Sequence, residues 1–185
     1  QSGNKNLDIS FLLQQCREGN QKAQFTVYQL YCKSMYNVAF RIVNQTEIAE
    51  EIMQDSFLKA FIKLDSFSRK VTFGAWLKKI VIHNSINELK KINKYPFETI
   101  SEHLSEEIEE AFEIGSWDEL KANHILKIMQ ELKPNYKLIL TLFFIEGYDL
   151  EEIATILSIS NENCRTTMSR AKTSLRKKYT EYVKS

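Results

Sequence analysis

The chain has 185 residues, with 25 Lys and Arg, 24 Asp and Glu, and a formal net charge of +1. This length predicts one or two small domains. Five glycines, two prolines and long stretches of helical periodicity favour an all-α protein. The sequence holds no apolar run long enough to cross a bilayer and no signal-peptide pattern, so we expect a cytoplasmic protein without membrane insertion.

The near-neutral total conceals three segments of different charge. Residues 1–94 hold 14 Lys and Arg against 8 Asp and Glu, a net of +6. Residues 95–120 have a net of −9, and residues 121–185 have a net of +4. Two basic ends indicate two separate contacts with a polyanion. We therefore predict two helical modules, at 8–94 and 121–182, joined by an acidic linker at 95–120.

Four segments of helical periodicity make up the first module. They are residues 8–20, 21–43, 46–64 and 72–91, and Thr46 and Thr72 are the predicted caps of the last two. The connecting segment 65–70 is polar, so we expect it to lie outside the core.

Cations and aromatic residues alternate at the end of this module. Residues 69–94 hold seven Lys and Arg and one acid, and aromatic rings lie among and before them at Phe57, Phe61, Phe67, Phe73 and Trp76. This mixture suits single-stranded DNA, because phosphates pair with cations and unstacked bases stack on rings. The alternative is that the rings form core. Core spacing favours that alternative for Phe57, Phe61 and Trp76, whereas Phe67 stands in the polar segment.

The acidic linker carries weaker signals. Pro96 disfavours a helix running through it, and Leu104, Ile108 and Phe112 have the spacing of one weak helix. Ser116 and Glu119 have capping-box spacing and predict a helix start, and Lys133-Pro134 marks its predicted end.

The segment 146–160, "EGYDLEEIATILSIS", predicts the first half of a helix-turn-helix. Asp149 and Glu152 have capping-box spacing at the start of a short apolar helix. A tight turn with a buried Ile159 follows, and Ser160 or Asn161 can cap the next helix. A short helix, a tight turn and a basic second helix is the pattern of this DNA-binding motif.

The second helix carries two stripes. Cys164, Met168, Ala171 and Leu175 recur at helical spacing and predict the buried face. A stripe of cations and hydroxyls lies beside them, and a solvated basic face is the alternative interpretation. In a helix-turn-helix the second helix enters the major groove. The candidate DNA contacts are then Asn163, Arg165, Thr166, Ser169, Arg170, Lys172 and Arg176.

Several classes of function lack support in the sequence. Cys16, Cys32 and Cys164 are widely spaced, which predicts reduced core cysteines. The three histidines are scattered, so we expect no metal site and no cofactor. The sequence holds no nucleophile–base set and no glycine-rich phosphate loop, so we expect no enzymatic activity.

Three segments in order resemble the signature segments of bacterial sigma factors. They are "AEEIMQDSFLKAFIKL", "FGAWLKKIVIHNSINELKK" and the helix-turn-helix segment followed by "TTMSRAKTSLRK". The resemblance is to the two-domain extracytoplasmic-function (ECF) group of the sigma-70 family, and it covers roughly residues 10–94 and 121–180. It implies a region 2 helical bundle at 8–94 and a region 4 helix-turn-helix at 121–182.

The family resemblance implies partners and sites. Region 2 would bind the β′ clamp helices of core RNA polymerase and open the −10 element, and region 4 would bind the β flap and read the −35 element. The implied clamp contacts are Glu50, Glu51, Gln54 and Asp55. The loop 65–71 would capture a base flipped from the non-template strand. The implied −10 contacts are Phe67, Ser68, Arg69, Lys70, Lys79, His83, Asn84, Asn87, Lys90 and Lys91.

The resemblance therefore predicts promoter-specific transcription initiation, with promoter DNA, core polymerase and an anti-sigma factor as partners. Many members have Arg-Asn where this chain has Ile82-His83, which affects the −10 base preference. Many have Asp where this chain has Asn87, so this chain lacks a negative charge near DNA. Many have Val or a similar residue where Cys164 stands. The alternative is a helix-turn-helix repressor that binds duplex DNA as a two-fold dimer without polymerase.

Overall fold

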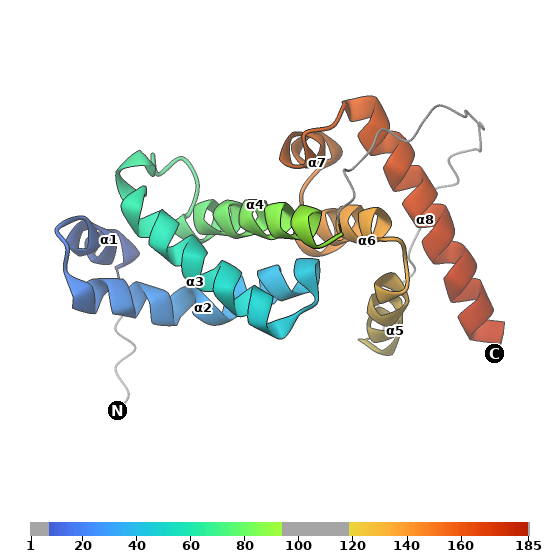
Figure 1. The fold of residues 1–185 in the computed structure, drawn as a ribbon, viewed down its shortest axis with the longest axis horizontal. Coiled ribbons are helices and arrows are strands. Elements are labelled where there is room, and N and C mark those ends of the chain that lie inside the picture. Colours follow the sequence, from blue (N-terminus) through green and yellow to red (C-terminus); the bar gives the residue numbers. More distant parts are fainter. Residues whose placement is uncertain (1–7, 94–118, 185) are drawn as a thin grey trace. The chain divides into compact units, whose positions relative to one another are not determined.

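The computed structural model describes residues 8–93 and 119–184, and the chain divides into two compact units, 1–94 and 95–185 (Figure 1). Every regular element in these described ranges is a helix, which confirms the all-α prediction. None of the helices in the described ranges combines the length and the apolar character that a membrane span needs. The predicted linker features at Pro96, Leu104, Ile108, Phe112 and Ser116 lie outside the described residues.

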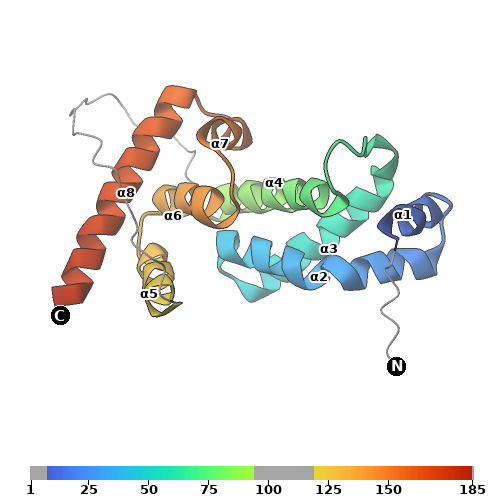
Figure 2. The same ribbon diagram turned by 180° about the vertical axis from the view of Figure 1, so that it is seen from behind.

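The first unit is a bundle of four α-helices. They are α1 (Ile9–Arg17), α2 (Gln21–Val43), α3 (Thr46–Ile62) and α4 (Phe73–Asn93), with the short 3-10 helix η1 (Leu64–Ser66) after α3. Helix α2 packs along both α3 and α4, and α1 packs against α2, as the view from behind shows (Figure 2). The predicted ranges match these helices to within a few residues at each end.

Capping side chains fix most of the helix starts in this unit. Asp8 accepts hydrogen bonds from the first turn of α1, and Asn20 does the same for α2. Thr72 caps α4, because its Oγ1 accepts from Ala75 N at 3.2 Å. The predicted cap at Thr46 is wrong: Thr46 is already helical, and the residue before it, Gln45, makes no side-chain cap bond.

Apolar side chains from all four helices meet in one core. Leu13, Val27, Ala49 and Leu77 are each no more than 2% exposed. The expectation that the segment 65–70 lies outside the core is wrong at one residue, because Phe67 is only 7% exposed. A ring in a polar stretch can still be buried when neighbouring rings provide a surface for it.

The second unit is built around the long helix α8 (Asn161–Lys184). Helices α5 (Glu119–Gln130), α6 (Pro134–Leu140) and α7 (Leu150–Leu157) each pack against α8, and a π-helical turn, η2 (Thr141–Ile145), follows α6. Pro134 lies in the first turn of α6, where its missing N–H costs nothing. The proline therefore opens the next helix, after α5 has ended at Gln130.

Candidate nucleic-acid interface

The start of α7 is fixed by a complete capping box. Asp149 Oδ1 accepts from Glu152 N at 2.8 Å, and Glu152 Oε2 accepts from Asp149 N at 3.1 Å. The backbone amides of Asp149 and Glu152 are both satisfied, which stabilises a helix of only eight residues. The prediction from the Asp149–Glu152 spacing is confirmed.

The turn between α7 and α8 is tight. Ser158 ends α7 in the left-handed region, with φ of 58°, and Ile159 N donates to Ala154 O at 3.0 Å. The sequence predicts that Ile159 is buried in this turn, whereas the structure shows its side chain half-buried. Ser160 Oγ accepts from Asn163 N at 3.1 Å, so Ser160 is the cap of α8 and Asn161 is its first residue.

The inner face of α8 matches the predicted stripe. Cys164 and Ala171 are 0% exposed, and Met168 and Leu175 are 3% and 2% exposed. The Cys164 thiol donates to Leu150 O at 3.3 Å, which ties α8 to the start of α7. Burial raises the pKa of this thiol, as expected for a cysteine that packs as a small apolar residue.

The predicted DNA contacts of α8 fall into two groups. Arg165, Thr166 and Ser169 are exposed in the first turns of the helix. The half-buried members are Asn163, Arg170, Lys172 and Arg176. The first group is available to a base edge without rearrangement, whereas Asn163 Oδ1 already accepts from Thr167 Oγ1 at 3.2 Å.

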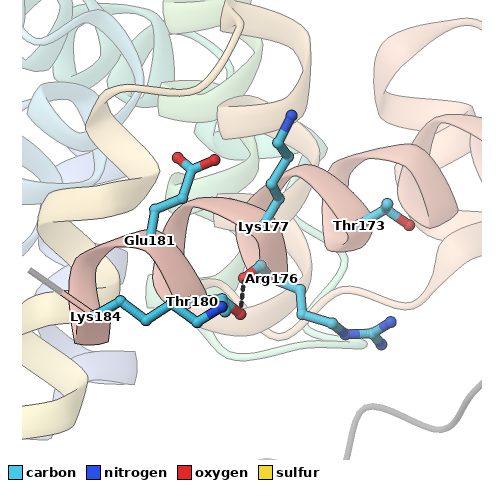
Figure 3. A pocket seen from close by; sticks show the side chains of 6 residues that line it. All are labelled: Thr173, Arg176, Lys177, Thr180, Glu181 and Lys184. Atoms are coloured by element: carbon cyan, nitrogen blue, oxygen red, sulfur yellow. Dashed lines mark hydrogen bonds between the residues drawn. The ribbon is translucent and has the colours of Figure 1, made fainter.

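Two predicted contacts lie away from the first turns of α8. Lys172 Nζ is 5.4 Å from the centre of the Phe143 ring, a cation–π contact that holds it over η2. Arg176 comes 11 residues after Arg165, which is about 16 Å along a helix axis. Figure 3 shows it next to Thr180 at a pocket on the last turns of α8, with Lys177 and Glu181 pointing to the other side of the helix.

The last turns of α8 are anchored on α5. Lys178 Nζ lies 3.0 Å from Glu131 Oε2, and the rings of Tyr182 and His124 have centroids 5.0 Å apart. Both contacts are made by the last turns of α8, far from its first turns.

In the first unit, the loop 65–71 forms an exposed turn over buried rings. Ser68, Arg69 and Lys70 are exposed, and Arg69 takes a left-handed φ of 59°. The Phe67 ring, by contrast, packs on Phe73 and Trp76 with centroids 5.8 and 5.3 Å away. The ring of Phe67 supports the loop from below, and a base could stack on it only if the ring left this cluster.

The predicted −10 residues of α4 share one exposed surface, with a single exception. Lys79, His83, Asn87 and Lys91 are exposed at helical spacing, and Lys90 is half-buried beside them. Lys91 Nζ donates a hydrogen bond to Glu88 Oε2 at 2.8 Å, and this contact raises the pKa of Lys91. Lys91 is therefore charged at neutral pH, and its ion pair with Glu88 offsets part of the positive charge of this surface.

Asn84 is the exception, because it lies half-buried where α4 meets α3. Its Oδ1 accepts from Lys59 Nζ at 2.9 Å, and its Nδ2 donates to Ser56 Oγ at 2.9 Å. The side chain is engaged within the bundle rather than offered to a base. Sequence reasoning missed Ser56 and Lys59, since their partner is more than 20 residues away along the chain.

The predicted clamp contacts form an acidic stripe on α3. Glu50, Glu51, Gln54 and Asp55 are all exposed. Two apolar residues that sequence reasoning missed continue the stripe: Leu58 is 61% and Ile62 is 82% exposed. Leu58 follows Gln54 by four residues and Ile62 follows Leu58 by four, and this spacing was the available signal.

Comparison with known families and proteins gives a consistent result. The family model described as "Sigma-70 region 2" matches residues 27–95, and "Sigma-70, region 4" matches residues 123–175. The RNA polymerase sigma factor YlaC of Bacillus subtilis (strain 168) is 31% identical over 157 residues, covering 84% of this chain and 91% of that protein. The ECF RNA polymerase sigma factor SigW of the same strain is 25% identical, covering 89% and 93%.

Two solved structures share the fold. CnrH in complex with the cytosolic domain of CnrY has a TM-score of 0.54 at 18% identity, covering 92% of this chain and 96% of that one. RpoE in complex with the anti-sigma factor NepR, from Bartonella quintana, has a TM-score of 0.54 at 20% identity, covering 82% and 93%. With both family regions present and sigma factors similar over most of its length, the chain belongs to the sigma-70 family, in the ECF group, and directs promoter-specific transcription initiation by RNA polymerase.

Proposed function

We propose that the two units divide promoter recognition between them. Residues 8–94 act as region 2, binding the polymerase through α3 and the −10 element through the loop 65–71 and α4. Residues 121–182 act as region 4, reading the −35 element with the first turns of α8, and residues 95–120 link the two. The chain performs no chemistry of its own, since the polymerase forms the bonds, and it acts where the polymerase is, in the cytoplasm.

The observation that carries this proposal is the opposite charge of two surfaces on the first unit. The exposed stripe of α3 bears Glu50, Glu51 and Asp55, whereas the exposed surface of α4 bears Lys79 and Lys91. An acidic stripe repels nucleic acid, so its partner must be something other than DNA. Exposed apolar side chains at Leu58 and Ile62 suit a protein partner, because their burial contributes to association.

The same charge separation disfavours a repressor. A repressor that works alone needs only a DNA-binding surface and a dimer contact. The acidic stripe beside the cationic surface is a protein-binding surface, and it requires a further protein partner. Core polymerase meets that requirement. The β′ clamp helices are the proposed target of α3, and the β flap is the proposed target of the second unit.

An anti-sigma factor is a further proposed partner. The structure of RpoE, which shares this fold, is a complex with the anti-sigma factor NepR. In this chain the acidic stripe of α3, formed by Glu50, Glu51, Gln54 and Asp55, is exposed. An inhibitor that covered it would block polymerase binding without unfolding the bundle.

Reconstitution with core polymerase tests the proposal. Transcription from a randomised promoter library should yield specific −10 and −35 sequences only when both core polymerase and this chain are present. Duplex binding by the chain alone should be weak and should depend little on sequence. Tight, sequence-specific binding of a two-fold dimer in the absence of core polymerase would instead support the repressor.

A further inference from the structure

We propose that Arg17, the last residue of α1, is a positioning residue for the loop 65–71. It holds the start of the loop in the shape that receives an unstacked base. This inference rests on the proposed function of the loop as the site of base capture. Arg17 lies outside residues 27–95, the segment that matches the region 2 family model, so the match itself gives it no role.

The guanidinium of Arg17 reaches the first turn of the loop. Its Nη2 donates to Leu64 O at 3.3 Å, and its Nε lies 3.6 Å from Asp65 Oδ1. The Leu64 carbonyl also accepts from Phe67 N at 3.1 Å. One carbonyl oxygen therefore receives two donors, one for each lone pair, and Arg17 ties the carbonyl that turns the chain into the loop to α1.

The carbonyl contact matters more than the ion pair. The side chain of Asp65 is 91% exposed, and an ion pair in that setting contributes little. The side chain of Arg17 is only 19% exposed, so water cannot easily replace its hydrogen bond to the carbonyl.

A second anchor holds the loop from below. The Phe67 ring packs on Phe73, and Phe73 packs edge-on against Tyr31 of α2 with centroids 5.4 Å apart. Gly74 permits this approach, because a Cβ at that position would lie 3.0 Å from Tyr31 Cε1. The rings fix the middle of the loop and Arg17 fixes its beginning, which leaves Ser68 to Val71 exposed at the tip.

This arrangement separates positioning from bundle stability. The face of α1 that packs into the core consists of Leu12, Leu13 and Cys16, each 8% exposed or less. Arg17 directs its guanidinium to η1 instead. Its loss should therefore loosen the loop while leaving the helices packed. A loop that is already ordered loses less conformational entropy when it binds a base, so loosening it should weaken base capture.

The test measures base flipping in the holoenzyme. Core polymerase is combined with the wild-type chain, with Arg17→Ala, or with Lys22→Ala as the matched control. Lys22 is an exposed cation at the start of α2, so the control removes the same charge. The promoter carries 2-aminopurine at successive positions of the non-template −10 strand, and its fluorescence rises when the base unstacks.

We expect Arg17→Ala to lower the flipping equilibrium by about two- to tenfold, the loss of one hydrogen bond, while Lys22→Ala leaves it unchanged. Core affinity should stay at the wild-type value in both, and the unfolding temperature should fall by only a few degrees in Arg17→Ala. Asp65→Asn should have a smaller effect than Arg17→Ala, because the carbonyl contact remains. If Arg17→Ala fails to fold, Arg17→Lys replaces it, since it keeps the charge but lacks the forked donors that reach Leu64 O and Asp65 together.

A variant of the loop itself distinguishes a wrong role for Arg17 from a wrong role for the loop. Ser68→Ala with Arg69→Ala changes the tip of the loop itself. If this variant leaves flipping unchanged, the loop is not the site of base capture and the proposed function of the loop is wrong. If it lowers flipping while Arg17→Ala and Arg17→Lys behave like Lys22→Ala, the loop captures the base but Arg17 does not position it.

Discussion

The Lys59 ammonium donates a hydrogen bond to Asn84 Oδ1 at 2.9 Å, and this contact joins α3 to α4. The other end of the same amide donates to Ser56 Oγ, and Ser56, which is 0% exposed, donates in turn to Ile52 O at 2.6 Å. A polar chain thus runs from the buried side of α3 to its surface. Both hydrogen-bonding groups of the Asn84 amide have partners within the bundle.

This network predicts that Asn84 stabilises the bundle and does not read DNA. Asn84→Leu removes two hydrogen bonds, one to an exposed lysine and one to a buried hydroxyl, and should lower the free energy of unfolding by about 1 kcal/mol. The −10 base preference should not change. His83→Ala, at the exposed neighbouring position, should do the reverse: weaken −10 binding and change stability by less than about 0.5 kcal/mol. Urea unfolding and promoter-variant transcription measure the two effects. A changed base preference in a fully stable Asn84→Leu variant would instead show that Asn84 contacts DNA.

Local signals explain why most of the helices could be predicted from the sequence. Asn20 begins α2 and Thr72 begins α4 because each side chain satisfies amides two or three residues away. The capping box of α7 and the buried stripe of α8 are equally local, since each depends on spacing along one helix. Periodicity and caps are properties that a sequence shows directly.

The features that sequence reasoning missed depend on contacts between elements. The amide of Asn84 is engaged because α3 brings Ser56 and Lys59 to it. Phe67 is buried because Phe73 and Trp76 lie beneath a segment that is polar on either side of it. Side-chain packing of this kind follows from the tertiary arrangement, so spacing along the chain could not reveal it.

The acidic stripe of α3 makes a second prediction, about polymerase binding. Glu51 and Asp55 are exposed and four residues apart on one helix face. Glu51→Lys with Asp55→Lys should abolish binding to core polymerase, because it reverses the charge that the partner surface must complement. Helix content should stay unchanged. Glu18→Lys, at an exposed acid directly after α1, is the control and should bind normally. A pull-down with core polymerase and far-UV circular dichroism measure the outcome, and unchanged core affinity in the double variant would refute the assignment.

The cysteines give a third prediction, about reactivity. Cys16 and Cys164 are 5% and 0% exposed, and burial raises the pKa of both thiols, so less of the reactive thiolate is present at neutral pH. Cys32 is half-buried. Iodoacetamide should therefore label Cys32 first in the native protein, and mass spectrometry of the peptides should find the other two unmodified. In urea all three should label at similar rates. Equally fast native labelling of Cys164 would mean that α8 separates readily from α7.

The recognition helix gives the last prediction, which separates base reading from phosphate binding. Arg165 is exposed in the first turns of α8, whereas Arg176 lies at the pocket on its last turns. Arg165→Ala should cost ~1–3 kcal/mol on the preferred −35 element and relax the preference at one base pair, because a base contact is lost. Arg176→Ala should weaken all promoters alike and lower the salt slope by about one unit, because a phosphate contact is lost and no base contact is. Cys164→Val, at the buried face of the same helix, is the control for packing and should leave −35 preference unchanged. Holoenzyme transcription from a panel of −35 variants at two salt concentrations measures all three. If Arg165→Ala scales every promoter down equally, a different face of α8 lies in the groove.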